Sequence, residues 1–121
     1  MSILKNMTTA NLLKDKLILE LVQSGHPRVY RNGRVFNRYG KVLSGWIDHD
    51  GYNRITVRIE GKKYSIRRHR LIWITFNSLI IDPSLVVNHR NGKKKCNSLL
   101  NLELVTKSDN LQHAWNIGLR G

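Results

Sequence analysis

The order of structural elements in this chain is decided by the stretch Leu85–Leu119, which reads LVVNHRNGKKKCNSLLNLELVTKSDNLQHAWNIGL. Its apolar runs LVV and LELV predict two short strands, and Asn91-Gly92 after the first run favours a turn, because both residues tolerate positive φ. The segment TKSD, which begins at Thr106, matches a capping box and predicts a helix that ends near Gly118. The predicted order is therefore strand, strand, helix.

Upstream of this stretch, residues 27–66 consist of short alternating runs separated by turn residues. The pairs Asn32-Gly33 and Asp50-Gly51 favour hairpin turns. In the run RITVRI, alternation puts the aliphatic side chains on one face, with Arg54 and Arg58 on the other. We therefore expect a basic antiparallel sheet whose polar face meets phosphates or base edges, the alternative being an ordinary solvated face.

Two further helices are predicted outside the sheet. The segment TTANLLKDKLILELVQSG offers Thr8 and Thr9 as N-caps and Gly25 as the residue that ends the helix, and its leucines lie close to one helical face. We expect this helix to be a packing element and not a site. A second helix is predicted over about 67–77, so the fold class is α+β.

The charge of the chain points to a polyanionic partner. The sequence has 21 Lys and Arg against 8 Asp and Glu, a formal charge of +13, and residues 26–70 alone carry a net +9. Such a surplus favours nucleic acid, because neutralised phosphates release counterions, and an anionic membrane comes second. We expect contacts to duplex DNA from Arg54, Arg58, Arg67, Arg68, Lys93, Lys94 and Lys95, although lysines in a loop are also common as solvated charges.

Cysteine content and hydropathy exclude several classes of protein. Cys96 is the only cysteine, so the chain has no internal disulfide framework and no zinc site built on a cysteine pair. No apolar run approaches the roughly 20 residues that span a bilayer, and the first residues lack a signal-peptide pattern. We expect a cytoplasmic protein without a membrane partner.

The histidines and asparagines of the C-terminal stretch are candidates for hydrolytic chemistry. Water that attacks a phosphodiester needs a base to take its proton and a cation to stabilise the charge on the phosphoryl group. His89 ends the first predicted strand, and an imidazole suits the base role near neutral pH. Asn110 and His113 share one helical face. Taken alone, a structural or exposed histidine and a solvent-facing polar stripe are the more common explanations of these residues.

Two segments in order resemble the HNH endonuclease family, in particular its phage and intron-encoded homing branch. They are YSIRRHRLIWITF and VVNHRNGKKKCNSLLNLELVTKSDN, within about Tyr64–His113. The resemblance implies a ββα-metal motif over residues 67–121, preceded by the N-terminal helix, 1–25, and a DNA-docking sheet, 26–66. It also implies that His69 supports packing or the surroundings of the site.

The resemblance implies roles for individual residues. His89 matches the general base, and Asn101 matches the asparagine that orders the loop and orients this base. Asn88 and Asn110 match metal ligands, and His113 matches a further ligand or a phosphate contact. The family often has aspartate where Asn88 stands, so we expect weak binding of the metal without DNA, since amides attract a hard cation less than carboxylates do.

The expected function is that of a metal-dependent DNA endonuclease. The resemblance implies Mg²⁺ or Mn²⁺ as cofactor, double-stranded DNA as substrate, and products with a 5′-phosphate and a 3′-hydroxyl. One site per chain favours nicking by a monomer or weak homodimer. The alternative is a DNA-binding protein derived from an HNH nuclease that has lost catalysis, and a basic RNA-associated protein is a weaker third hypothesis.

Overall fold

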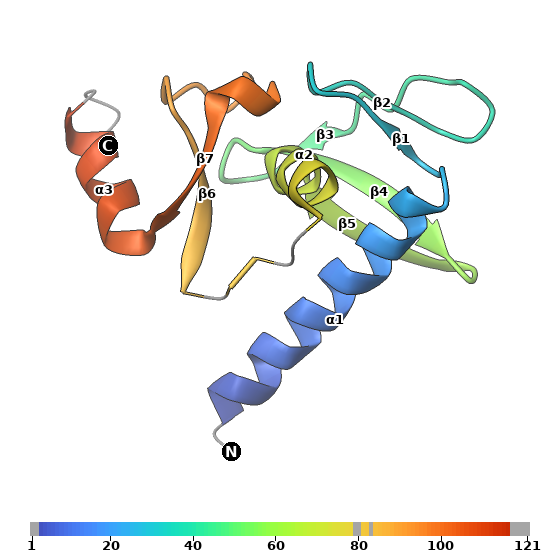
Figure 1. Ribbon diagram of the computed structural model, residues 1–121, viewed down its shortest axis with the longest axis horizontal. Helices are drawn as coiled ribbons and strands as arrows, with labels where there is room; N and C mark the ends of the chain where they lie inside the picture. The colour runs from blue at the N-terminus through green and yellow to red at the C-terminus, as the bar shows by residue number, and fades with distance from the viewer. Residues whose placement is uncertain (1–2, 79–80, 83, 117–121) are drawn as a thin grey trace.

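The computed structural model describes residues 3–78, 81–82 and 84–116, with side chains from residue 12 to residue 112 of these ranges (Figure 1). Three helices, seven strands and one 3-10 turn follow one another along the described chain. Their order is α1 (Ile3–Gln23), β1 (Arg28–Val29), β2 (Val35–Phe36), β3 (Trp46–Ile47), β4 (Asn53–Ile59), β5 (Lys62–Arg67), α2 (Arg68–Asn77), β6 (Leu85–His89), η1 (Leu99–Asn101), β7 (Leu102–Thr106) and α3 (Lys107–Asn116).

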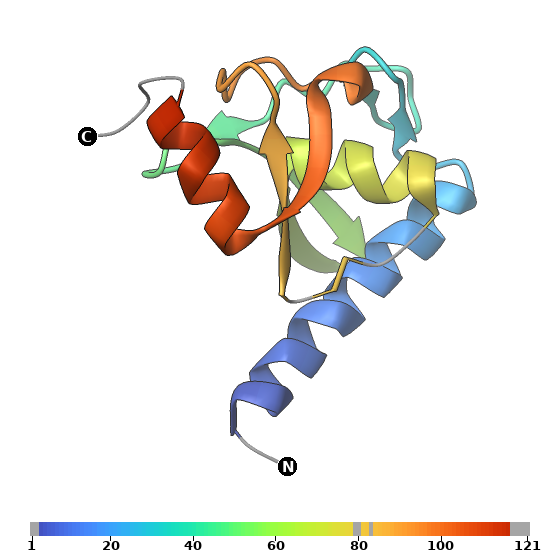
Figure 2. The same ribbon diagram turned by 60° about the vertical axis from the view of Figure 1, so that its left-hand side comes forward.

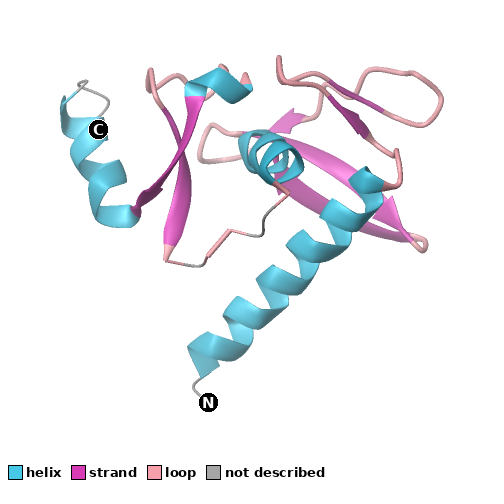
Figure 3. Ribbon diagram, in the orientation of Figure 1, coloured by secondary structure: helices cyan, strands magenta, loops and turns pink. Residues whose placement is uncertain are grey.

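The strands form three small antiparallel sheets, with the orders β1-β2, β3-β4-β5 and β6-β7 (Figure 3). The predicted α+β class is confirmed, but the single sheet expected over residues 26–66 is wrong, because the structure divides this segment into two sheets. Gly45 lies between them at φ +70°, and a Cβ at this position would stand 2.1 Å from the Arg54 carbonyl oxygen. The backbone therefore leaves the extended conformation at the point where the prediction continued a strand.

Helix α2 lies at the centre of the molecule and contacts α1, the β4-β5 hairpin, β6 and η1 (Figures 1 and 2). Its Leu71, Ile72 and Ile74 are fully buried. They belong to one hydrophobic core that takes residues from α1, β2, β4, β5, α2, β6 and β7. Its buried members are Ile18, Leu19, Val35, Ile55, Val57, Ile66, Leu71, Ile72, Ile74, Ile81, Val87 and Leu102. One core thus joins the three predicted segments of the chain.

Strand β4 confirms the predicted alternation, since Ile55 and Val57 are buried whereas Thr56 and Arg58 are exposed. Helix α1 begins at Ile3, so the predicted caps Thr8 and Thr9 lie inside it. The predicted cap of α3 is confirmed, because the backbone N–H of Asp109 donates to Thr106 Oγ1 at 3.1 Å. The predicted end of α3 near Gly118 lies outside the described residues.

The β6-β7 hairpin lies between α2 and α3 (Figures 1 and 2). Its register pairs Asn88 with Glu103 and His89 with Leu102. Because neighbouring residues of a strand point to opposite faces, this hairpin presents one set of side chains to α2 and another to α3. None of the helices among the described residues is long and apolar enough to cross a membrane.

Candidate active site

His89 lies at the end of β6 in a stack of aromatic rings. It is buried, and its ring centroid is 4.6 Å from that of His69 on α2. Tyr52 completes the stack, with its centroid 5.1 Å from that of His69 and 6.0 Å from that of His89. Strand β6, helix α2 and the turn before β4 therefore fix the imidazole plane.

The hydrogen bond that His89 makes to Asn97 determines which nitrogen of the His89 ring is free to take a proton. His89 Nε2 lies 2.9 Å from Asn97 Oδ1. The amide nitrogen of Asn97 donates to the Lys95 carbonyl, at 3.4 Å, so the amide oxygen is the atom that faces the ring. An amide oxygen only accepts, so Nε2 carries the hydrogen and Nδ1 presents its lone pair.

Burial keeps both histidines of the stack neutral. It lowers the pKa of His89, against the opposing effect of the hydrogen bond to Asn97, and the nearby Lys94 ammonium lowers it further. Burial also lowers the pKa of His69 to about 3, with help from His89, Arg67 and Arg70. At neutral pH, His89 is therefore in the form that can accept a proton.

Asn101 orders the loop between β6 and β7. Its Nδ2 donates to Asn91 Oδ1 and to the Cys96 carbonyl, both at 2.9 Å, and its Oδ1 accepts from the Asn91 N–H at 3.1 Å. This is the loop-ordering role that the resemblance implied. The bond that orients His89 comes from Asn97 instead, a residue that the sequence analysis missed and that only the asparagine-rich character of the loop could have pointed to.

Asn88 points to the opposite face of the hairpin from His89. His89 packs on α2, so alternation turns Asn88 toward the side of α3. Its Nδ2 donates to Glu103 Oε1 at 2.9 Å, and Arg90 forms an ion pair with the other oxygen of Glu103 at 3.3 Å. The structure thus adds Glu103, a residue not predicted from the sequence, to the surroundings of Asn88.

The second predicted metal ligand, Asn110, is half-buried on α3, the helix that packs against β6 and β7. His113 belongs to the same helix, but its side chain lies outside the described residues. The structure therefore brings the elements that carry Asn88 and Asn110 together, while His89 stands across the β6 strand from them.

The donors on the α3 side of the hairpin fit a hard divalent cation that is held weakly. Amide oxygens of Asn88 and Asn110 and a carboxylate at Glu103 are the oxygen donors that Mg²⁺ and Mn²⁺ accept. Among the described residues, no group of three or more His, Cys, Asp or Glu side chains stands ready to bind a metal ion.

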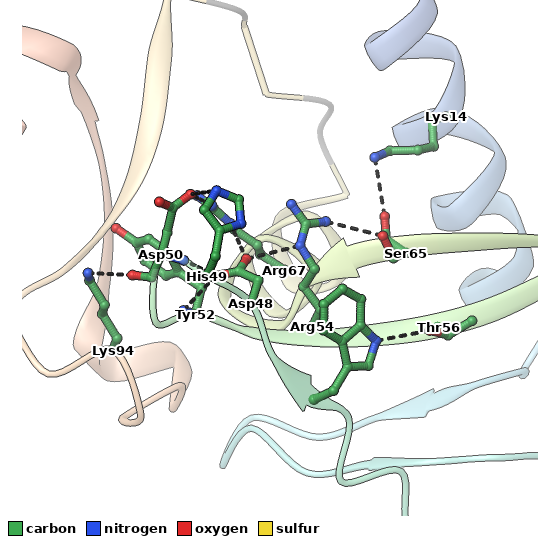
Figure 4. Close-up of polar contacts among 11 residues, drawn as sticks. Lys14, Asp48, His49, Asp50, Tyr52, Arg54, Thr56, Ser65, Arg67 and Lys94 are labelled. Carbon is green, nitrogen blue, oxygen red and sulfur yellow. Dashed lines mark hydrogen bonds and ion pairs between the residues drawn. The ribbon is translucent and has the colours of Figure 1, made fainter.

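Two cationic side chains, Arg67 and Lys94, lie beside Tyr52 of the stack (Figure 4). Arg67 lies over the Tyr52 ring, with Cζ 4.1 Å from the centroid, and Lys94 Nζ lies 4.7 Å from the same centroid. Lys94 also donates to the Asp50 carbonyl at 2.8 Å. The side chains of Arg58, Lys93, Lys94 and Lys95 are exposed.

Asp48 holds two of the predicted DNA-contacting arginines in place. Its Oδ2 accepts from Arg54 Nε at 3.0 Å and from Arg67 Nε at 3.1 Å. Burial acts to raise the pKa of Asp48, but the Tyr52 N–H and the two arginines outweigh it and hold this pKa well below its usual range. The carboxylate thus stays charged and anchors both guanidinium groups on the sheet.

Arg68 does not lie at the surface, in contrast to the prediction. It is buried, and its Nε, Nη1 and Nη2 donate at 2.6 Å to Asn53 Oδ1, the Gly33 carbonyl and the Leu43 carbonyl. All three nitrogens are used to connect β4 with the two loops around β2. The positive charge pattern of the sequence misled the prediction, because it does not distinguish a structural arginine from a surface one.

Comparison with known proteins agrees with this geometry. Residues 67–112 match the HNH endonuclease family. The DNA endonuclease I-HmuI of Bacillus phage SP01 is 36% identical over 95 residues, which cover 78% of this chain and 54% of the relative. The H-N-H endonuclease F-TflI of Escherichia phage T5 is 37% identical over 78 residues, which cover 62% of this chain and 40% of the relative.

A solved structure shows the same fold. It is that of the HNH homing endonuclease I-HmuI, which binds and cleaves DNA; it superposes with a TM-score of 0.69 and 34% identity, over 80% of this chain and 56% of the other. The chain thus spans about half the length, or less, of the relatives it matches. The ordered motif, the ββα arrangement and these matches together establish that the chain belongs to the HNH endonuclease family, of the phage homing type.

Proposed function

We propose that this protein is a metal-dependent endonuclease that hydrolyses a phosphodiester bond of duplex DNA, with His89 as the general base. The observation that carries the proposal is the hydrogen bond between His89 and Asn97, which leaves Nδ1 with a lone pair on a ring that is kept neutral. The HNH match over residues 67–112 supports the same reaction class.

The base step follows from the environment of His89. Nδ1 takes a proton from water as that water attacks phosphorus, and the imidazolium that forms keeps its Nε2–H bond to Asn97 Oδ1. The amide dipole stabilises this charge, whereas burial and Lys94 oppose it, so the ring releases the proton readily afterwards. Stacking on His69 and Tyr52 prevents the ring from turning away.

We infer that Asn88 and Asn110 hold the divalent ion, Mg²⁺ or Mn²⁺, with Glu103 nearby and His113 as a further candidate. When bound, such an ion stabilises the charge on the phosphoryl group and on the leaving oxygen. Asn88 turns to the α3 side of the hairpin and His89 to the α2 side, but both residues stand at the end of β6, so the ion and the base would have to meet at one phosphate bound across this end of the strand. Because the protein donors are mostly neutral, the phosphate completes the site.

The DNA contacts that we propose come from the basic side chains around this site. Arg54, Arg58 and Arg67 lie on the β4-β5 sheet, and the lysines 93–95 flank the loop that carries Asn97. Duplex DNA on this surface places a phosphodiester beside the aromatic stack. Each phosphate that these cations neutralise releases counterions and makes binding depend on salt.

A plasmid assay tests the proposed activity. Supercoiled plasmid incubated with the protein and Mg²⁺ is expected to give open-circular DNA with 5′-phosphate ends, because one site per chain favours nicking, and EDTA is expected to stop the reaction. The second candidate, a DNA-binding protein without catalysis, is favoured by the amide at Asn88 where a carboxylate ligand is common. Stable binding of duplex DNA with no EDTA-sensitive conversion of plasmid supports that candidate instead.

A further inference from the structure

A cationic cavity of about 400 Å³ lies between α1, the β4-β5 hairpin and the first residues of β6 and α3. Five of the residues that line it are cationic, and they come from five elements: Lys14, Arg54, Arg67, Arg70 and Lys107. The charge does not belong to one exposed helix or loop. It converges from separate parts of the fold, including the N-terminal helix that the sequence analysis predicted to be a packing element only.

Two of these cations are brought close together by one residue (Figure 4). Lys14 Nζ donates to the Ser65 carbonyl at 3.2 Å, and Arg54 Nη1 donates to Ser65 Oγ, also at 3.2 Å. Burial lowers the pKa of Lys14, and Arg54 and Arg70 lower it further, although Asp15 acts in the opposite direction. Like charges at this range repel, and an anion between them offsets the repulsion.

The carboxylates around the cavity neutralise only part of its charge. Asp15 is buried and forms an ion pair with Arg70, and Asp48 is shared by the two sheet arginines. Asp50 adds a second ion pair to Arg67, so five cations face three carboxylates, a net of +2. Within the described part of the chain, neither Lys14 nor Lys107 forms an ion pair with a carboxylate.

The cavity is connected to the candidate active site and open to a large ligand. Arg67 lines the cavity and also lies over the ring of Tyr52, which stacks on His69. The side chains of Arg54, Arg67 and Arg70 are 25%, 27% and 29% exposed, so each still reaches the surface. A polyanion that binds over the aromatic stack therefore meets Arg67, which also lines this cavity.

We propose that this cavity binds a backbone phosphate of the DNA duplex beside the cleavage site, with Lys14 and Lys107 as its contacts from α1 and α3. The inference rests on the proposed function, since it takes duplex DNA as the substrate. It adds the N-terminal helix, which lies outside the 67–112 family match, to the DNA-binding surface. A free inorganic phosphate has the same chemistry and is the competing source of the anion.

Salt-dependent binding of a labelled 30-base-pair duplex, measured by fluorescence anisotropy in EDTA, tests the proposal. Lys14→Ala is expected to lower the slope of log Kobs against log salt by about 1 and to weaken binding roughly fivefold to tenfold at 0.1 M salt. Lys16→Ala is the matched control, because Lys16 is exposed on the same helix and does not line the cavity. It is expected to leave the slope unchanged.

Two further variants keep the test decisive if Lys14→Ala folds poorly. Lys14→Arg retains the charge and is expected to retain the slope. Lys107→Ala removes a cation from the first turn of α3, where the helix dipole gives it no stabilisation, so this variant is expected to fold and to lower the slope. Equal slopes for the wild type, Lys14→Ala and Lys107→Ala overturn the proposal.

The same experiment separates this proposal from the proposed function. Duplex binding by the wild type that does not depend on Lys14 or Lys107 overturns the cavity assignment alone, whereas a wild type that does not bind duplex DNA overturns both. Titration with inorganic phosphate, followed by calorimetry, distinguishes the sources of the anion. If Lys14→Ala loses tight binding of phosphate but keeps the slope of log Kobs against log salt for DNA, the cavity is a small-anion site. This result also overturns the assignment to DNA.

Discussion

Replacing the buried His69 by glutamine is expected to make the protein lose less stability than the wild type between pH 7 and pH 5. Burial, together with His89, Arg67 and Arg70, lowers the pKa of His69 to about 3. An unfolded histidine has a pKa of about 6.5. As the pH falls, the unfolded chain therefore binds this proton first, and the folded state loses stability below about pH 6.5.

The size of the effect follows from the difference between the two pKa values. At pH 5 the unfolded histidine is protonated and the folded one is not. This difference lowers the free energy of unfolding by about 2 kcal/mol, and near pH 3 by about 4 kcal/mol. Glutamine does not titrate, yet its amide can still donate to the Val87 carbonyl that His69 contacts. The lowered pKa of His89 acts in the same direction and leaves a smaller loss in the variant.

Urea unfolding at pH 7, 6 and 5, followed by circular dichroism, measures this difference. His49→Gln is the matched control, because the side chain of His49 is 91% exposed whereas that of His69 is buried. The free energy of unfolding of His69→Gln is expected to fall by about 2 kcal/mol less than that of the wild type over this interval. Parallel curves for the two proteins refute the buried, neutral state of His69.

Three further predictions concern the base, the buried arginine and the metal. Asn97→Asp places a carboxylate 2.9 Å from His89 Nε2, which raises the pKa of His89. The acidic limb of the pH–rate profile for plasmid cleavage is therefore expected to move to higher pH by about 1–3 units. A limb that does not move argues against His89 as the base. Arg68→Gln is expected to lower the free energy of unfolding, measured in urea, by roughly 3–5 kcal/mol, because the Gly33 and Leu43 carbonyls lose their donors. The control Arg58→Gln, at an exposed position, is expected to change it by no more than about 0.5 kcal/mol. Similar losses for both variants refute the structural role of Arg68. Calorimetry of the DNA-free protein with Mg²⁺ is expected to show no saturable heat, and tight stoichiometric binding contradicts a weak set of donors around Asn88.

Local signals in the sequence predicted the elements of the nuclease motif well. The apolar runs on either side of the Asn91-Gly92 turn became β6 and β7, and the cap at Thr106 begins α3 as expected. These features depend on neighbours within a few residues of the chain. The same holds for the alternation in β4, where burial separates the aliphatic side chains from Thr56 and Arg58.

Contacts between distant segments were beyond the reach of the sequence pattern. The stack on His89 joins rings from three separate segments of the chain, and its orienting hydrogen bond is accepted by Asn97, eight residues along an irregular loop. Arg68 looked like part of a basic surface because its partners are backbone carbonyls at residues 33 and 43, which leave no mark in the charge pattern. Tertiary contacts, not local preference, decide these three cases.

Plasmid cleavage and DNA affinity of His89→Ala, measured on the same preparation, test the central claim most directly. With Mg²⁺, the rate at which supercoiled plasmid disappears is expected to fall by about 100-fold to 10,000-fold, the usual contribution of a general base. In EDTA, the dissociation constant for a short duplex is expected to stay within about twofold, because the imidazole is buried and the proposed DNA contacts are other side chains. Cleavage within tenfold of the wild type, or an equal loss of affinity and cleavage, contradicts the assignment of His89 as the base.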